Sequence, residues 1–149
     1  MPFSLYHASV GAYLQILPSV AGLVTKAEAH CAEKGLPAEA LTGARLADDM
    51  WPFAKQVTAA CAHSFGAIEA LRSGETGPDL NPPPGNFAAL AAKVAAAVAG
   101  LQAVTEEEIA ALEGGEVVFR FGERAMPFTA SDYVLSFALP NFYFHASMA

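Results

Sequence analysis

Apolar residues recur every three or four positions along several stretches of the chain, which is the spacing of one face of an α-helix. In the first stretch, residues 4–34, this spacing lies between a serine that can cap a helix and Gly35, which can end one. The second stretch begins at a cap supplied by Asp48 or Asp49 and ends near Arg72. Its apolar stripe is formed by Phe53, Val57, Cys61, Ser64, Ile68 and Leu71. The pattern predicts two long amphipathic helices in the first half of the chain.

The second half of the chain contains two further long helical patterns and one short one. Asn86 can cap a third long helix, whose narrow apolar seam is formed by Phe87, Leu90, Val94, Val98 and Leu101. Thr105 opens a capping box with three glutamates, which predicts a short helix ending near Leu112. The last long helix is predicted for residues 129–149, with a bend at Pro140.

The segments between the helices carry turn and loop signals. Residues 36–49 are of mixed polarity and predict a connector with room for one helical turn. Residues 75–86 contain four prolines and two glycines, so they predict a loop that lets the chain cross over. Residues 116–121 and 124–129, joined by Gly122 and Glu123, predict a β-hairpin with a tight turn.

These elements determine the expected architecture. Each apolar stripe must be buried against another helix, so the pattern predicts an all-α, up-and-down four-helix bundle with one small β-hairpin before the last helix. A length of 149 residues is usual for one domain, and we expect residues 1–149 to form a single helical bundle domain.

Composition narrows the classes of function. Apolar residues make up 54% of the chain, but no uninterrupted apolar run reaches the ~20 residues that cross a bilayer, so we expect no membrane segment. The net charge of −7, with eight Lys and Arg residues, argues against nucleic-acid binding. Residues 1–17 carry no export signal, and Cys31 and Cys61 are interpreted as reduced, buried thiols. These features predict a cytoplasmic protein.

One stripe near the end of the chain is the best candidate for a functional site. Tyr133, Phe137, Asn141 and His145 are spaced four residues apart and therefore share one helix face. An imidazole and a carboxamide among aromatic rings are polar groups that need partners. The stripe therefore predicts a polar pocket in an aromatic setting.

Histidines from other helices extend this candidate site. His7, His63 and His145, together with Gln56 and Asn141, come from the first, second and last long helices. Three imidazoles suit zinc or nickel, but no HxxxH or HExxH pair places two ligands on one helix face. The alternatives are a metal site, metal-free acid–base chemistry, and histidines that are ordinary core or rim residues.

Aromatic residues outside the stripe add two expectations. Tyr13 and Trp51 are candidates for the walls of a ligand pocket. Asp48 and Asp49, just before Trp51, offer carboxylates to a ligand, but helix capping explains them without a site. Phe142 and Tyr143 point away from the stripe, which predicts a second buried face and therefore a homodimer.

Several segments together resemble an uncharacterised family of the DUF1993 type. They are Ser4-Leu5-Tyr6, Ala44 to Met50, Phe53 to Val57, Asp132-Tyr133, and Phe137 to His145 with its sequence F-A-L-P-N-F-Y-F-H. The family is similar to the DinB/YfiT-like superfamily, so the resemblance implies a DinB-like bundle over nearly the whole chain.

The resemblance also implies a metal site to compare with this chain. In the superfamily three histidines hold a divalent metal, one on the second helix and two in an HxxxH pair on the last, and some branches are thiol-dependent transferases or hydrolases. Here His145 matches one member of the pair, whereas the other falls on Asn141 or Ala149. The ligand on the second helix falls near Gln56 or His63.

We therefore expect a protein of unknown function with a polar pocket that binds a small molecule. The candidate catalytic residues are His145 and Asn141, and the candidate ligand-binding residues are Gln56, His63, His7, Tyr13 and Trp51. His145 and His63 are the candidate ligands of a divalent metal, zinc or nickel, although the incomplete triad favours no cofactor. The alternatives are a divalent-metal-dependent hydrolase or thiol transferase, and a non-catalytic dimeric structural or interaction protein.

Overall fold

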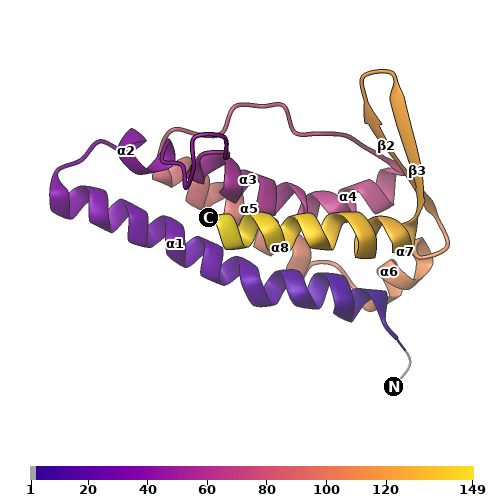
Figure 1. Cartoon of the computed structure of the whole chain (residues 1–149). Helices are drawn as coiled ribbons and strands as arrows, with labels where there is room; N and C mark the ends of the chain where they lie inside the picture. The colour runs from indigo at the N-terminus through magenta and orange to yellow at the C-terminus, as the bar shows by residue number, and fades with distance from the viewer. Residues whose placement is uncertain (1–2) are drawn as a thin grey trace.

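The computed structural model describes residues 3–149 and is mostly helical, with a small three-stranded sheet at one end (Figure 1). The longer helices are α1 (Ala12–Lys34), α3 (Phe53–Ala62), α4 (Phe65–Ser73), α5 (Phe87–Gln102) and α8 (Leu139–Met148). Shorter helical segments are η1 (His7–Gly11), α2 (Glu39–Thr42), α6 (Glu106–Leu112), α7 (Ala130–Asp132) and η2 (Tyr133–Ala138). The strands are β1 (Glu75–Thr76), β2 (Glu116–Phe121) and β3 (Arg124–Thr129).

The core lies where the long helices pack side by side. α1 packs against α5, and α3 packs against both α8 and α5. The largest side chains in this core are completely buried and come from several helices; they include Tyr13, Leu17, Ile68, Leu90, Leu101 and Phe142. The predicted helical stripes therefore do bury themselves against one another.

The first helical segment has the predicted ends. The Ser4 hydroxyl accepts a hydrogen bond from the His7 backbone N–H at 3.3 Å, and Gly35 ends α1 in the left-handed conformation with a φ of 62°. Within residues 3–149, the helical run His7–Lys34 is the one helix long and apolar enough to pass a test for a membrane span. Part of its apolar face, including Leu17 and Val20, is buried in the core.

The second predicted helix is wrong in two respects. It does not start at Asp48 or Asp49, because Pro52 restricts the residue before it to extended conformations and α3 begins only after this proline. It is also not continuous. The Ser64 hydroxyl donates to the carbonyl of Ala60 at 2.7 Å, and the chain leaves the helix between α3 and α4. The break places His63 at the end of α3.

Both caps predicted in the middle of the chain are confirmed. The Asn86 side chain accepts from the Ala89 N–H at 2.8 Å at the start of α5. The Thr105 hydroxyl accepts from the Glu108 N–H at 3.2 Å at the start of α6. The Glu108 carboxylate does not complete the predicted capping box, because it accepts a hydrogen bond from Arg72 of α4 at 2.7 Å.

The last helical segment begins as predicted but contains a wide turn. The Thr129 hydroxyl accepts from the Asp132 N–H at 3.1 Å and caps it. The π-helical segment η2 ends two residues before Pro140, which has no N–H to donate. The Asn141 side chain donates to the carbonyl of Phe137 at 2.7 Å and satisfies one backbone acceptor in this region.

Phe142 does not lie on a face that a partner chain could cover, contrary to the prediction. It is fully buried against Tyr13, with their rings edge to face at 4.8 Å between centroids. Tyr143 and Phe144 are the exposed aromatic residues of α8. The homodimer inferred from a second buried face stays a prediction, and Phe142 cannot contribute to it because the chain's own core covers this side chain.

The β-hairpin forms as predicted, and it carries one additional strand. β2 and β3 pair in antiparallel fashion from Glu116 opposite Thr129 to Phe121 opposite Arg124. The loop predicted for residues 75–86 contributes β1, which pairs in parallel with β2. A strand of two residues is too short to give an alternating pattern, so the sequence did not reveal it.

Gly77 continues the line of β1 alongside β2, where the two backbones approach closely. A Cβ at this position would lie 2.8 Å from the carbonyl oxygen of Arg120. We expect Gly77→Ala to lower the free energy of unfolding by about 1–3 kcal/mol, because the backbone of one strand must move. Gly85→Ala is the matched control in the same loop, since a Cβ there meets nothing within 4 Å. Urea denaturation should show that this control is unchanged or slightly stabilised, and equal losses in both variants would contradict the prediction.

Candidate functional site

Three parallel rings form the centre of the candidate site. The imidazole of His145 lies between the indole of Trp51, at 5.1 Å and 5°, and the imidazole of His63, at 5.5 Å and 11°. Trp51 lies in the segment before α3, His63 lies at the end of α3, and His145 lies near the end of α8. Packing of α3 against α8 therefore assembles the stack from segments far apart in the sequence.

A buried hydrogen bond fixes the orientation of His145. The Oε1 atom of Gln56 lies 2.7 Å from Nδ1 of His145, and both side chains are buried. An amide oxygen can only accept, so the imidazole carries its proton on Nδ1 and leaves a lone pair on Nε2. The Gln56 amide nitrogen donates to the carbonyl of Trp51 at 3.3 Å, which holds the glutamine in place. The arrangement selects one tautomer of His145.

Both stacked imidazoles are uncharged at neutral pH. Burial, followed by the nearby His145, lowers the pKa of His63 to about 4. Burial and the positive charge of Lys55 lower the pKa of His145 below its usual value. Neutral imidazoles accept and donate hydrogen bonds but supply no charge for holding an anion.

A cavity of about 240 Å³ opens beside the stack. All four residues of the predicted stripe, Tyr133, Phe137, Asn141 and His145, line it. The remaining walls come from α3, the start of the 75–86 loop and β2, and include His63, Lys55, Thr76, Leu80 and Phe119. The four-residue spacing of the stripe thus corresponds to one continuous wall of a single cavity.

Lys55 attaches the loop to the helical part of the site. Its ammonium donates to the carbonyl oxygens of Asp79 at 2.6 Å and Asn81 at 3.1 Å, and it lies 5.6 Å from the centre of the Trp51 ring. Lys55 was missed as a site residue, because its contacts with Asp79 and Asn81 join residues 24 and 26 positions apart, which a single sequence does not specify.

One polar atom of the site is buried with no partner among the described residues. Nδ1 of His63 is inaccessible to solvent and makes no hydrogen bond within residues 3–149. The rings of His63 and Phe137 meet edge to face at 5.8 Å between centroids, and this neighbour offers no acceptor or donor. A buried imidazole nitrogen without a partner costs stability, and a shift of the ring toward the cavity would let a bound molecule satisfy it.

The structure brings five of the predicted site residues together and leaves two apart. His145, His63, Gln56, Asn141 and Trp51 form the stack and its surroundings. His7 lies elsewhere, beside Ser4 and Glu106, and is largely exposed. Tyr13 is completely buried in the core against Phe142, so burial raises the pKa of its hydroxyl.

The reason for the separation of His7 is its position along the helix axis. The first helical segment starts at the end of the molecule that carries the hairpin, whereas α8 runs away from this end and finishes further along the bundle (Figure 1). Helical periodicity predicts the face on which a residue lies, but it does not predict which residue of a neighbouring helix lies at the same height.

The cysteines behave as expected for core residues. Cys31 and Cys61 are both buried and form no disulfide. Burial raises the pKa of the Cys61 thiol to about 11, so the thiol stays protonated at neutral pH. Cys61 therefore lacks the thiolate that a nucleophile needs.

Comparison with solved structures defines the class of the protein. The fold is similar to the crystal structure of a DinB family member from Shewanella denitrificans, with a TM-score of 0.76 and 22% sequence identity over 97% of this chain and 81% of that chain. The chain thus has a DinB-like fold. The model of the family described as a domain of unknown function, DUF1993, matches residues 5–149, and the chain belongs to that family. No curated protein matches it.

The residues present do not fit the three-histidine metal site that the resemblance implies. Within residues 3–149, no three His, Cys, Asp or Glu side chains are grouped closely enough to hold one ion. His63 and His145 stack face to face, and Nδ1 of His145 is already bonded to Gln56. Two imidazoles arranged in this way do not direct their lone pairs to a common point, and the neighbouring Asn141 is a poor substitute for a third.

Proposed function

We propose that this chain binds a small, uncharged and largely apolar molecule in the cavity beside His63 and His145, through one hydroxyl or amide group of that molecule. The observation that carries the proposal is the unpartnered Nδ1 of His63, a residue that lines the cavity together with the aromatic stripe. A hydroxyl or amide both donates and accepts, so it satisfies this nitrogen in either tautomer of the imidazole.

The size of the cavity supports a ligand of about one aromatic ring. Its volume of about 240 Å³ exceeds the ~150 Å³ that accommodates benzene in an engineered protein cavity. It is smaller than the ~300 Å³ at which pockets for drug-sized molecules begin. The side chains of Phe119, Phe137 and Leu80 supply apolar walls for such a ring.

The charges around the cavity support a neutral ligand. Both imidazoles are uncharged at neutral pH because burial lowers their pKa values. Lys55 is the one cationic side chain among the lining residues, and Asp79, whose carboxyl has a lowered pKa, lines the same cavity. A carboxylate would therefore be desolvated without gaining a free cation.

The proposal gives separate roles to the polar residues. His63 forms the hydrogen bond to the ligand, and Gln56 positions His145 so that its Nε2 lone pair remains available as a second acceptor. The Asn141 amide nitrogen donates one of its two N–H groups to the Phe137 carbonyl, which fixes the amide and leaves its oxygen free to accept from a ligand donor. Trp51 forms the outer layer of the stack, where its indole is partly exposed.

A binding experiment with phenol, benzamide and benzoate tests the proposal. Trp51 is the only tryptophan of the chain and lines the cavity, so its fluorescence responds to binding there. We expect saturable changes with phenol and benzamide, with Kd values of about 1 mM or tighter, and binding of benzoate at least tenfold weaker. His63→Phe keeps an aromatic ring and removes the nitrogen, and we expect it to weaken phenol binding about fivefold or more.

The matched control is His7→Phe, which makes the same substitution at an exposed position away from the cavity. This variant should bind phenol as the wild type does. The proposal is wrong if neither neutral probe saturates, or if the His63 variant binds phenol as tightly as the wild type.

A further inference from the structure

One wall of the cavity is a short length of exposed loop, residues 77–81, which we call the strap. Its first four residues all line the cavity. Leu80 is one of them, although it is 78% exposed, and of residues 77–81 only Asp79 is partly buried. Beyond the strap the loop runs past α3 to the start of α5 (Figure 1). The strap therefore closes one side of the cavity without being part of the core.

The strap is attached to the helices by a single side chain. Across residues 78–84, every hydrogen bond to another part of the described chain comes from the Lys55 ammonium, which donates to the carbonyls of Asp79 and Asn81. Four of these seven residues, at positions 78 and 82–84, are prolines and have no N–H to donate. The loop therefore has few donors of its own with which to replace the bonds from Lys55.

The strap is shaped in advance for this contact. The Asp79 carboxylate accepts from the backbone N–H of Asn81 at 3.0 Å and from its side-chain amide at 2.9 Å. This closed turn sets the carbonyls of residues 79 and 81 so that one ammonium reaches both, at 2.6 Å and 3.1 Å. Lys55 itself is on α3, whose packing against α8 and α5 fixes its position. A rigid helix thus holds a loop that has little other attachment.

We propose that Lys55 holds the strap closed over the cavity, and that release of the strap is the route by which a molecule reaches His63. A segment with one attachment and little buried apolar surface opens at a lower cost in free energy than the helices of the core. Lys55 is then a positioning residue for the strap. The inference takes its ligand from the proposed function, but access to the cavity can be measured without that ligand.

Modification of His63 by diethyl pyrocarbonate, followed by peptide mass spectrometry at pH 7, measures this access in the full chain. The reagent attacks neutral imidazoles, and His63 is neutral at pH 7 because burial lowers its pKa to about 4. Lys55→Met keeps the alkyl stem and removes the ammonium. We expect it to raise the rate of modification at His63 about fivefold or more, while the rate at the exposed His7 stays unchanged.

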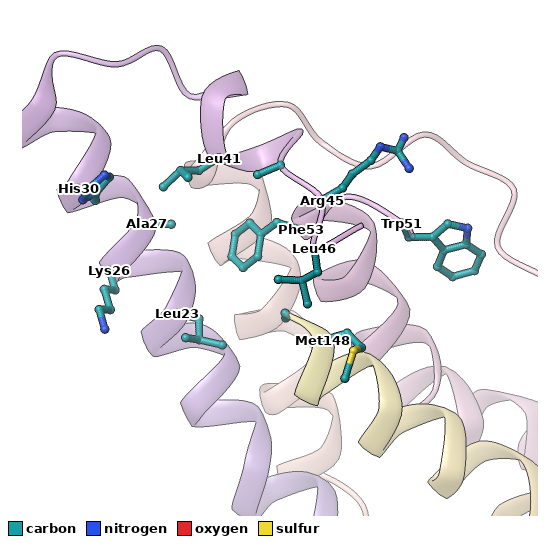
Figure 2. A pocket seen from close by; sticks show the side chains of 12 residues that line it. Leu23, Lys26, Ala27, His30, Leu41, Arg45, Leu46, Trp51, Phe53 and Met148 are labelled. Carbon is teal, nitrogen blue, oxygen red and sulfur yellow. The ribbon is translucent and has the colours of Figure 1, made fainter. Parts of the chain in front are cut away.

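Two control variants separate the hydrogen bonds from other effects. Lys55→Arg keeps donors for both carbonyls, so its rate at His63 should stay within about twofold of the wild type. Lys26→Met makes the same substitution on α1, away from Trp51 and the cavity, and should leave the rate unchanged (Figure 2). Cys31 is buried in the core and should stay unreactive toward iodoacetamide in every variant, which excludes global unfolding as the cause of a faster rate.

Equal rates at His63 in the wild type and Lys55→Met would overturn the inference, because the reagent would then enter by another route. An equal rise in Lys26→Met would also overturn it. A rise confined to Lys55→Met, in a protein that shows no saturable binding of phenol or benzamide, would support the role of Lys55 and contradict only the function proposed for the cavity.

Discussion

Gln56→Leu is expected to lower the free energy of unfolding by about 1–3 kcal/mol. The substitution introduces an apolar side chain of similar size and leaves the Nδ1–H of the buried His145 without its acceptor. His145→Phe should carry a cost of the same order for the opposite reason, because it leaves the Gln56 amide oxygen unpaired in the same buried position. Urea denaturation followed by circular dichroism measures both changes.

The double variant Gln56→Leu/His145→Phe separates the hydrogen bond from the packing. The phenylalanine ring can still stack on Trp51, and no polar group of the pair remains to be satisfied. We therefore expect its loss of stability to be smaller than the sum of the two single losses by about 1–2 kcal/mol. Ser9→Ala is the control partner, since the Ser9 hydroxyl is buried and bonded to Leu5 in the first helical segment.

The Ser9→Ala/His145→Phe combination should give additive losses to within about 0.5 kcal/mol. Additive losses for Gln56 and His145 as well would show that the two side chains are not hydrogen-bonded in solution. If the apolar pair is as stable as the wild type, stability alone does not explain the polar pair. That result would favour a role for the Nε2 lone pair of His145 in binding.

Those parts of the fold that depend on neighbouring residues were predictable from the sequence. The Asn86 and Thr105 caps, the left-handed Gly35 and the bounds of the hairpin each depend on residues within one turn. The break at Ser64 was missed, because the apolar stripe of the second helical pattern continues across it without interruption. Periodicity records which face is buried and does not record a local loss of helical hydrogen bonds.

The candidate site was also predictable only in part: the local spacing was predicted, whereas contacts between distant residues were not. The stripe from Tyr133 to His145 was predicted from its spacing, and it does line one cavity. The pairing of Gln56 with His145 joins residues 89 positions apart, which a single sequence does not specify. The grouping of His7 with the other histidines was wrong because helical faces were predicted but axial positions were not. The contacts between helices decide which polar residues meet.

The stability of the protein should fall between pH 7 and pH 5 because of His63. Burial and the neighbouring His145 lower its pKa to about 4 in the folded chain, whereas the unfolded chain has the ordinary value of about 6.5. Below pH 6.5 the His63 imidazole is therefore protonated in the unfolded state while it is still neutral in the folded state. This stabilising contribution is complete above pH 6.5 and is lost as the pH falls toward 4.

At pH 5 the linkage amounts to about 2 kcal/mol, since the unfolded imidazole is largely protonated and the folded one is not. His63→Phe cannot bind the proton, so its unfolding free energy should fall by about 2 kcal/mol less than that of the wild type between pH 7 and pH 5. Urea midpoints at the two pH values measure the difference, and His7→Phe should follow the wild type, because His7 is exposed. Parallel pH profiles for the wild type and His63→Phe would mean that His63 is not held neutral against the stack, and the hydrogen-bonding role proposed for it would fail with that result.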